Sequence, residues 1–359
     1  MSGNVQNPKH ISVQECSGNN LAVSILKYNL GLSLIIIAAM VRVLNYCAPQ
    51  GGVFSCNAKQ ERDPFKFFDP IKERLSAKAR SFLPSPHSEL ILGMTIGVDD
   101  LSMSPRFKNA LKRTGTIHVV VVSGFNMSLV AGYALKIFGS PYKIGNLLLT
   151  ILSTLVYAAF TGFEPPVLRA WVMSSFMLVG KYSGRLLNTL RLLVVSYFVV
   201  LLINPGNFFS MSTYLSFLAT LGLVVFADPI EKFFEKLFKK KTAIFSDFSS
   251  SLAAQITVWP LISGVFGQVS LISLLVNALV LWMVPITTIL GIPALILPGG
   301  LIWLLCFPFC DFFVRVVNYF SRFEIASVAW KMPWWGMTGY YLMLLILVVW
   351  IVRKRERLG

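Results

Sequence analysis

The chain has 359 residues, of which 55% are hydrophobic and only 13% are charged, and its formal net charge is +16. Soluble chains normally carry about a quarter charged residues, so this composition excludes an ordinary soluble globular protein. The positive excess fits a membrane protein with basic cytoplasmic loops, and binding of an anionic ligand would produce the same excess.

The first long apolar run, LGLSLIIIAAMVRVLNYC, covers residues 30–47. No small-residue cleavage signal follows it, so it predicts an uncleaved first span rather than a signal peptide. Cys47 and Cys56 flank the outer end of this span, where a disulfide and two free thiols are equally open. Cys306 and Cys310 lie in a later apolar run and are expected to pack there. No CxxC pair and no Cys/His group with zinc spacing occurs, so we predict no metal site and no cofactor.

Residues 48–117 form the one sizeable polar segment. Within it, residues 63–83 read DPFKFFDPIKERLSAKARSFL, which predicts an amphipathic helix. Two groups of basic residues belong to this segment: Lys72, Arg74, Lys78 and Arg80, and then Arg106, Lys108, Lys112 and Arg113. We predict that they bind an anionic polymer arriving from outside. The alternative is a helix that lies on anionic lipid headgroups.

Nine further apolar stretches follow, each of about the length needed to cross ~30 Å of hydrocarbon. They predict helices near residues 118–138, 145–161, 166–182, 187–203, 209–227, 248–266, 270–297, 300–320 and 337–352. Together with the first span, these give an all-α polytopic membrane protein with about ten transmembrane helices, some of them broken or re-entrant.

The positive charges set the expected orientation. Four basic connections fall on one side when ten spans alternate: Lys136 with Lys143; Lys181 with Arg185 and Arg191; residues 231–241; and residues 353–357. Basic loops stay in the cytoplasm, so both termini are predicted inside and residues 48–117 outside. The predicted division is an amino-terminal segment with the first span (1–47), an extracytoplasmic segment (48–117), a transmembrane domain (118–352) and a basic tail (353–359).

Polar residues interrupt several of these spans. The candidates are His118, Ser123, Gly124, Asn126, Glu164, Arg169, Ser216, Gln255 and Asn277. A polar side chain at membrane depth costs free energy unless it faces protein or a water-filled path, so these residues predict the lining of a conduit. The alternatives are hydrogen bonds between packed helices, small-residue packing at Ser123 and Gly124, and an internal pair of Arg169 with Glu164.

A hydrolase built on Ser123 and His118 is disfavoured. The two residues are five apart, which places them about 140° apart around a helix and makes a direct hydrogen bond poor. No GxSxG surrounds Ser123, because residue 121 is Val. We therefore predict that the protein is not an enzyme and has no catalytic residues.

Four stretches, in order, resemble ComEC-type competence proteins. TGTIHVVVVSGFNMSLVAG (114–132) is similar to the family's histidine and Ser-Gly signature, with Asn126 where a second histidine commonly stands. FTGFEPPVLRA (160–170) resembles its Thr-Gly, proline and Arg-Ala element. NPGNFFSMSTYLSFLATLGL (204–223) resembles its Asn-Pro and Leu-Ser-Phe-Leu-Ala element. WPLISGVFGQVSLISLLVNALVLWMVP (259–285) resembles its Phe-Gly, Ser and Asn element, here Phe266, Gly267, Ser270 and Asn277.

The resemblance implies a channel for single-stranded DNA in the bacterial inner membrane during natural transformation. Larger members carry an oligonucleotide-binding-like domain and a metallo-β-lactamase-like domain. Residues 48–117 are short for the former, and no HxHxDH cluster marks the latter, so a short form is expected.

No GxxxxGK[ST] occurs, so a separate motor or the membrane potential would have to supply the energy. The resemblance implies a separate DNA receptor, a nuclease and an ATP-driven motor as partners, besides the lipid bilayer. A homo-oligomer stays open. The other candidate functions are transport of a small solute or lipid, and a non-catalytic scaffold of the uptake machinery.

Overall fold

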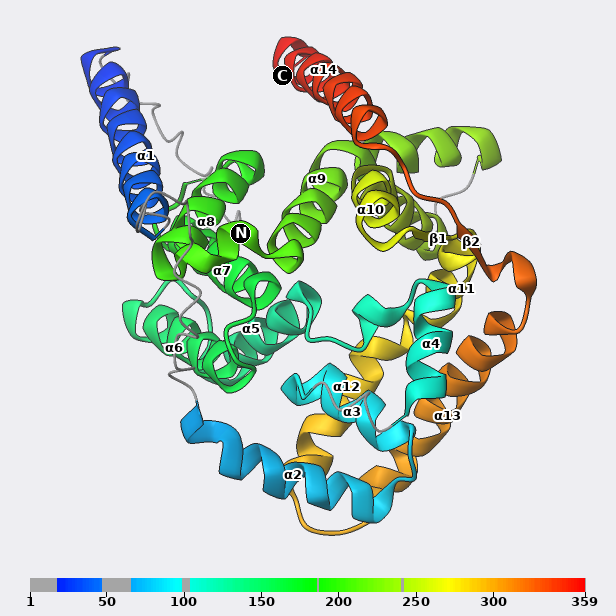
Figure 1. Cartoon of the computed structure of the whole chain (residues 1–359). Coiled ribbons are helices and arrows are strands. Elements are labelled where there is room, and N and C mark those ends of the chain that lie inside the picture. The colour runs from blue at the N-terminus through cyan, green and yellow to red at the C-terminus, as the bar shows by residue number, and fades with distance from the viewer. Residues whose placement is uncertain (1–17, 47–65, 99–103, 186, 240–241, 359) are drawn as a thin grey trace, which may run out of the picture.

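The computed structural model describes residues 18–46, 66–98, 104–185, 187–239 and 242–358, and this part of the chain is almost entirely helical (Figure 1). Cys47 and Cys56, for which a disulfide and two free thiols were equally open, lie outside these residues.

Helices fill the amino-terminal half. They are α1 (Gly18–Tyr46), α2 (Asp69–Phe82), α3 (His87–Ile96), α4 (Pro105–Thr114), α5 (Gly124–Phe138), α6 (Ile144–Phe160), α7 (Pro165–Tyr182) and α8 (Thr189–Ile203). Short 3₁₀ turns cover Lys66–Phe68, Ile117–Val119 and Pro205–Phe209.

The carboxyl-terminal half adds longer helices and two short strands. They are α9 (Met211–Phe238), α10 (Ala243–Phe266), β1 (Gln268–Ser270), α11 (Ser273–Val280), α12 (Met283–Ile296), α13 (Leu301–Ser321), β2 (Ser327–Ala329) and α14 (Trp334–Leu358). The strands pair antiparallel, with Val269 opposite Val328, and a 3₁₀ turn covers Glu324–Ala326.

Most predicted helices are present with small shifts at their ends. Two predicted helices are broken. The stretch 118–138 starts as a 3₁₀ turn and becomes α-helical only at Gly124, while 270–297 divides into β1, α11 and α12. Residues 231–238 extend α9 beyond its apolar part. The ion pair of Lys232 Nζ with Asp228 Oδ2, 3.0 Å apart and one turn earlier, supports the helix where this extension begins.

Length and composition qualify four helical stretches as membrane spans, Ile117–Phe138, Met211–Phe238, Leu301–Ser321 and Trp334–Ile351. The pair α11 and α12, bent by 47° at its break, raises the number to five in the described part of the chain. The apolar helices Leu32–Tyr46, Ile144–Phe160 and Thr189–Ile203 are shorter.

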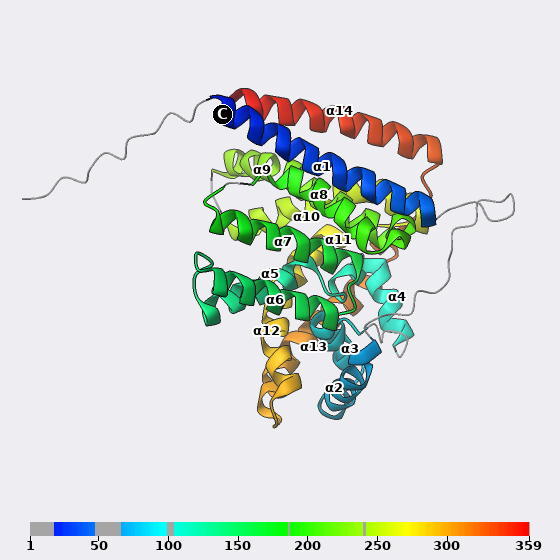
Figure 2. The same cartoon turned by 90° about the vertical axis from the view of Figure 1, so that its left-hand side faces the viewer.

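The helices form two regions that differ in direction. The parallel region consists of α1, α5–α10 and α14. In Figure 2, α1, α6, α7, α8 and α14 run in roughly the same direction, and the start of α1 and the end of α14 lie at the same end; Figure 1 shows that α1 and α14 themselves stand apart. The core region consists of α2–α4 and α11–α13. Figure 2 shows α12 running across the direction of α1 and α14, on the far side of α5 and α6.

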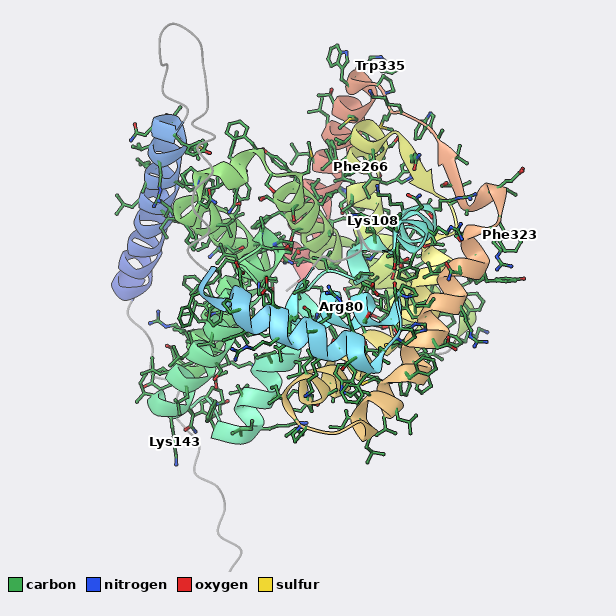
Figure 3. The ribbon with its side chains drawn as sticks, turned by 60° about the horizontal axis from the view of Figure 1, so that its bottom comes forward. Arg80, Lys108, Lys143, Phe266, Phe323 and Trp335 are labelled. Atoms are coloured by element: carbon green, nitrogen blue, oxygen red, sulfur yellow. The ribbon has the colours of Figure 1, made fainter. Side chains whose placement is uncertain are left out.

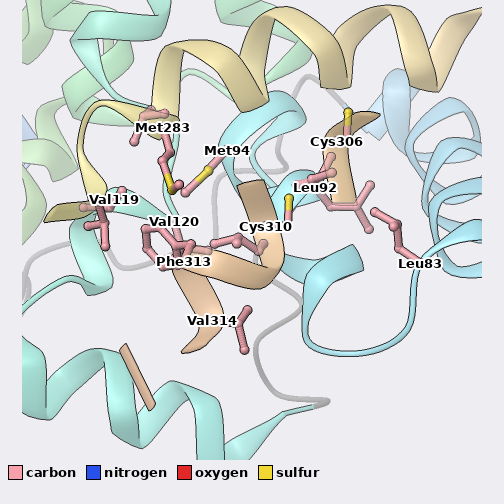
Figure 4. Close-up of a cluster of buried hydrophobic side chains, with 14 of the residues drawn as sticks. Leu83, Leu92, Met94, Val119, Val120, Met283, Cys306, Cys310, Phe313 and Val314 are labelled. Atoms are coloured by element: carbon pink, nitrogen blue, oxygen red, sulfur yellow. The ribbon is translucent and has the colours of Figure 1, made fainter. Parts of the chain in front are cut away.

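The core region surrounds α3, whose ten residues are all buried. Its apolar cluster joins α2, α3, α4, α11, α12 and α13, and Figure 4 shows Leu92 and Met94 of α3 among Cys306, Cys310 and Phe313 of α13. The two cysteines are fully buried, which confirms the prediction that they pack.

The parallel region has only small buried clusters. One joins Val225 and Phe226 of α9 to Ala253 of α10, and another joins α1 to α8. Many of its large apolar side chains face outward, among them Leu148 on α6 and Ile346 on α14. Such a surface suits contact with lipid rather than with water.

Candidate functional site

The segment between α4 and α5 confirms the predicted break. Gly115 ends α4 in the left-handed region with φ 71°, and a 3₁₀ turn carries His118. Ser123 is extended, with φ −110° and ψ 168°, and α5 begins at Gly124. His118 is exposed, and its ring lies next to the backbone of Gly115. The apolar run therefore does not continue as one helix through the Ser-Gly pair.

Arg169 on α7 connects this break to α9. Its Nε donates to Ser216 Oγ at 2.9 Å, and its guanidinium carbon lies 5.9 Å from the centre of the Phe217 ring. A Cβ added at Gly124 would lie 3.3 Å from both Arg169 Nη2 and Ala170 Cβ. A side chain at this position would need the guanidinium and Ala170 to shift by a few tenths of an ångström, because both lie so close to the first turn of α5. Three separate predicted elements thus meet at one half-buried arginine.

Asn126 occupies a different environment from Arg169. It is 1% exposed, and its Nδ2 donates to the Met94 carbonyl of α3 at 2.8 Å. Thr288 Oγ1 of α12 donates to Asn126 Oδ1 at 3.5 Å. The amide therefore bonds the parallel region to the core region. Its proposed role in a conduit stays a prediction, while its packing role is visible.

A second polar group lies where α10, α11 and the end of α4 meet. Gln255 Nε2 donates to Ser273 Oγ at 2.6 Å, and Ser273 Oγ donates to the Ser270 carbonyl at 3.2 Å. A Cβ at Gly115 would lie 2.7 Å from Ser273 Cβ, so the end of α4 packs directly on α11. One turn on, Asn277 is 4% exposed, and its Oδ1 has no hydrogen-bond partner among the described residues.

Glu164 lies at the start of α7. It is half-buried and occupies the position just before the first helical turn, with Pro165 as the first helical residue. Proline is favoured there because its missing N–H would lack an intrahelical partner in any case. The turn before it is tight, since Gly162 has φ 97° and Phe163 has φ 50°.

The eight basic residues predicted to bind an anion divide into two kinds. Lys78 Nζ donates to the Leu295 and Leu297 carbonyls at 2.9 and 2.6 Å, and Arg113 Nη2 donates to the Phe323 carbonyl at 3.0 Å. These three bonds fasten α2 to the end of α12 and α4 to the end of α13.

Lys72 approaches the Phe160 ring, 6.0 Å from its centre, and Lys108 is half-buried. Four are exposed: Arg74, Arg80, Arg106 and Lys112. Figure 3 shows Arg80 on α2 and Lys108 on α4, so the two basic groups come from separate helices.

The predicted amphipathic helix is present as α2. Ser76, Ala79 and Leu83 are buried against the core region, whereas Phe67 and Ile71 are exposed. Leu75 also packs against the core cluster, and the Phe82 ring stacks on Trp303 of α13, so both small and large residues of the segment contact the core region.

Sequence reasoning missed the polar residues around α3. His87 Nε2 lies 3.3 Å from Asp311 Oδ1, Arg315 Nε lies 2.6 Å from Asp311 Oδ2, and Glu89 is 1% exposed with Ser88 Oγ donating to it. The sequence signal that could have revealed this polar group is the triplet His87-Ser88-Glu89, directly before an apolar stretch. In the described residues, no three His, Cys, Asp or Glu side chains are grouped as metal ligands.

The fold and these contacts define a class: an all-α membrane protein with four to five candidate spans and polar residues at helix breaks. The family model for the competence protein matches residues 94–354. The chain therefore belongs to the competence protein family, which confirms the resemblance stated from the sequence.

Curated relatives agree with this family. ComE operon protein 3 of Bacillus subtilis is 28% identical over 72% of the chain and 31% of its own length. The uncharacterized protein YcaI of Escherichia coli is 26% identical over 62% of the chain and 30% of its own length. The chain thus spans about a third of these relatives. No solved structure matches it.

Proposed function

We propose that this chain forms the membrane conduit through which single-stranded DNA enters the cell during natural transformation. Membership of the competence protein family supports a part in DNA uptake. The observation that carries the conduit is the contact of Arg169 with Gly124 and Ser216, because it joins three sequence elements at the break of an apolar helix.

A polyanion needs a wet path through the bilayer. Moving one ion into a medium of dielectric ~4 costs on the order of 20 kcal/mol before relaxation, and DNA carries one phosphate per nucleotide. Arg169 offers a guanidinium that stays charged and can fork onto phosphate oxygens. Gln255 and Ser273 carry neutral donors for water or phosphate, and the buried Asn277 Oδ1 can accept a hydrogen bond from water; without a charge, none of them binds phosphate tightly.

We further propose the orientation of the parallel region. The start of α1 and the end of α14 lie at one end in Figure 2, which supports cytoplasmic termini. Ten spans were predicted from the sequence, and eight of them belong to the parallel region. The other two predicted spans, 270–297 and 300–320, belong to the core region. Eight and two are both even numbers, so the spans of each region together return the chain to the side of the membrane on which it began. The helices α2, α3 and α4 then lie toward the outer face of the bacterial inner membrane.

Uptake into vesicles tests the proposal. The 359-residue chain is reconstituted into liposomes, and entry of a fluorescent single-stranded oligonucleotide is measured as protection from added nuclease. We expect Arg169→Gln and Gly124→Leu to lower protected DNA at least tenfold. The matched control is Arg191→Gln, which removes the same charge from an exposed position in the first turn of α8.

Three outcomes would overturn the proposal. The first is normal DNA entry in well-expressed Arg169→Gln and Gly124→Leu variants. The second is entry of a labelled small solute or lipid in place of DNA, which would indicate a transporter. The third is uptake only when other uptake proteins are added, with no dependence on Arg169, which would indicate a scaffold.

A further inference from the structure

A polar groove runs between α4 and α13, away from Arg169. One hollow of about 380 Å³ is lined by Arg106, Asn109 and Arg113 of α4 and by Asn318, Ser321 and Arg322 at the end of α13. A neighbouring hollow of about 740 Å³ shares Arg106, Asn318 and Arg322 and continues past Ser104 to Pro86. The shared residues make the two hollows one elongated groove.

The groove is positively charged. Three arginines line the first hollow, and no acidic residue does so among the described residues. Arg113 is held in place by its bond to the Phe323 carbonyl, while Arg106 and Arg322 are exposed. Asn109 and Asn318 add neutral amides. Guanidinium and amide donors together match phosphate oxygens, because the guanidinium is a fixed fork and stays charged.

Two exposed aromatic rings lie close in sequence to the groove residues at the end of α13. Tyr319 is 59% exposed and Phe323 is 47% exposed, on either side of Arg322 in sequence. They pack edge-on to each other, with centroids 5.5 Å apart, so both rings are held in position. Figure 3 shows Phe323 at the outer edge of the molecule. Exposed rings beside a row of cations are the combination on which unpaired bases stack while their phosphates are bound.

We propose that this groove docks the phosphate backbone of single-stranded nucleic acid, with bases stacking on Tyr319 and Phe323. The inference rests on the proposed function and adds a receiving site from α13 that the sequence alone did not indicate. A lipid headgroup shares the phosphate chemistry. A polymer is favoured because two adjoining hollows share Arg106 and Arg322, and the row of guanidinium groups along them suits the repeated phosphates of a nucleic-acid strand.

Binding to the full chain in nanodiscs of zwitterionic lipid tests the groove. The probe is a fluorescent 20-nucleotide poly-dT, titrated at several salt concentrations. Arg106→Gln with Arg322→Gln should weaken binding at least tenfold and flatten the salt dependence by about 0.7 per lost phosphate contact. Tyr319→Ala should weaken binding about tenfold without changing the salt slope, because stacking releases no counterions.

The matched control is Arg315→Gln. Arg315 is on the same helix, is exposed and carries the same charge, but it pairs with Asp311 and does not line the groove. The inference is wrong if the double variant binds poly-dT with the wild-type affinity and salt slope. It is also wrong if the double variant loses only binding to vesicles of anionic lipid.

The vesicle assay separates the two proposals. The groove variants should lose poly-dT binding, whereas Arg169→Gln should lower DNA entry and leave poly-dT binding unchanged. This pair of results supports a groove distinct from the conduit. Unchanged docking in the groove variants, with entry still lost in Arg169→Gln, overturns the groove alone. If DNA enters normally in the Arg169→Gln variant while the groove variants lose poly-dT binding, the conduit proposal alone is overturned.

Discussion

The core region and the parallel region are held together in different ways. Among the described residues, twenty-four buried apolar residues form one continuous cluster that lies in the core region apart from Val119 and Val120, which precede α5. The clusters that include α9 with α10, or α1 with α8, have four and three. Outward-facing apolar side chains predominate in the parallel region instead. The core region therefore packs like the interior of a soluble protein, although it belongs to a membrane chain.

The comparison shows which interactions decide how the helices pack in each region. Between helices in lipid, apolar burial adds little, so close approach and interhelical hydrogen bonds decide the packing. Gly222 illustrates this, because a Cβ there would lie 2.5 Å from Thr257 Oγ1 of α10. In the core region the same task falls to shape-fitted apolar residues around α3.

The largest effect is expected in the core region. Phe313 is 1% exposed at the centre of the apolar cluster, so Phe313→Ala should lower the free energy of unfolding by about 3–5 kcal/mol. The matched control, Ile346→Ala on the lipid-facing side of α14, should change it by no more than about 0.5 kcal/mol. SDS titration in mixed micelles measures both. Equal losses at the two positions would show that the regions do not differ in this way.

A smaller effect is expected where the regions join. Asn126→Leu removes the bonds to the Met94 carbonyl and to Thr288, and it should cost about 1–3 kcal/mol, because buried polar partners are left unpaired. Hydrogen exchange should show faster opening in both α3 and α5. Opening confined to α5 would mean that Asn126 does not connect the two regions.

The smallest effect is expected inside the parallel region. Thr257→Val keeps the shape of the side chain and removes its bond to the Leu218 carbonyl of α9, which is 2.8 Å long. Hydrogen bonds between membrane helices average about 0.6 kcal/mol, so the same SDS titration should show a loss of that order. A loss above about 2 kcal/mol would show that this hydrogen bond contributes more to the stability of the α9–α10 pair than hydrogen bonds between membrane helices usually do.

Much of the site could be found from the sequence because each signal is local. The break at Ser123-Gly124 follows from a polar pair inside an apolar run, and the structure starts α5 there. The buried state of Cys306 and Cys310 follows from their neighbours. Family membership follows from four short stretches in order, and the family model confirms it.

Other features could not be found in this way because they depend on partners distant in sequence. Nothing near Lys78 indicates that it donates to carbonyls at the end of α12, more than two hundred residues away. Likewise, Asn126 and Arg169 look alike as polar residues in apolar runs. In the structure, Asn126 is fully buried and bonds α5 to α3, whereas Arg169 is half-buried and lies between α5 and α9.

The sequence by itself determined the bilayer as the medium, the helices and the family, because hydropathy, periodicity and short motifs act over a few neighbouring residues. The tertiary structure alone decided that α11–α13 pack with α3 instead of joining the parallel helices. It also decided that the arginines of α4 and α13 line one groove. Such pairings depend on side-chain fit across the fold, which a linear pattern does not encode.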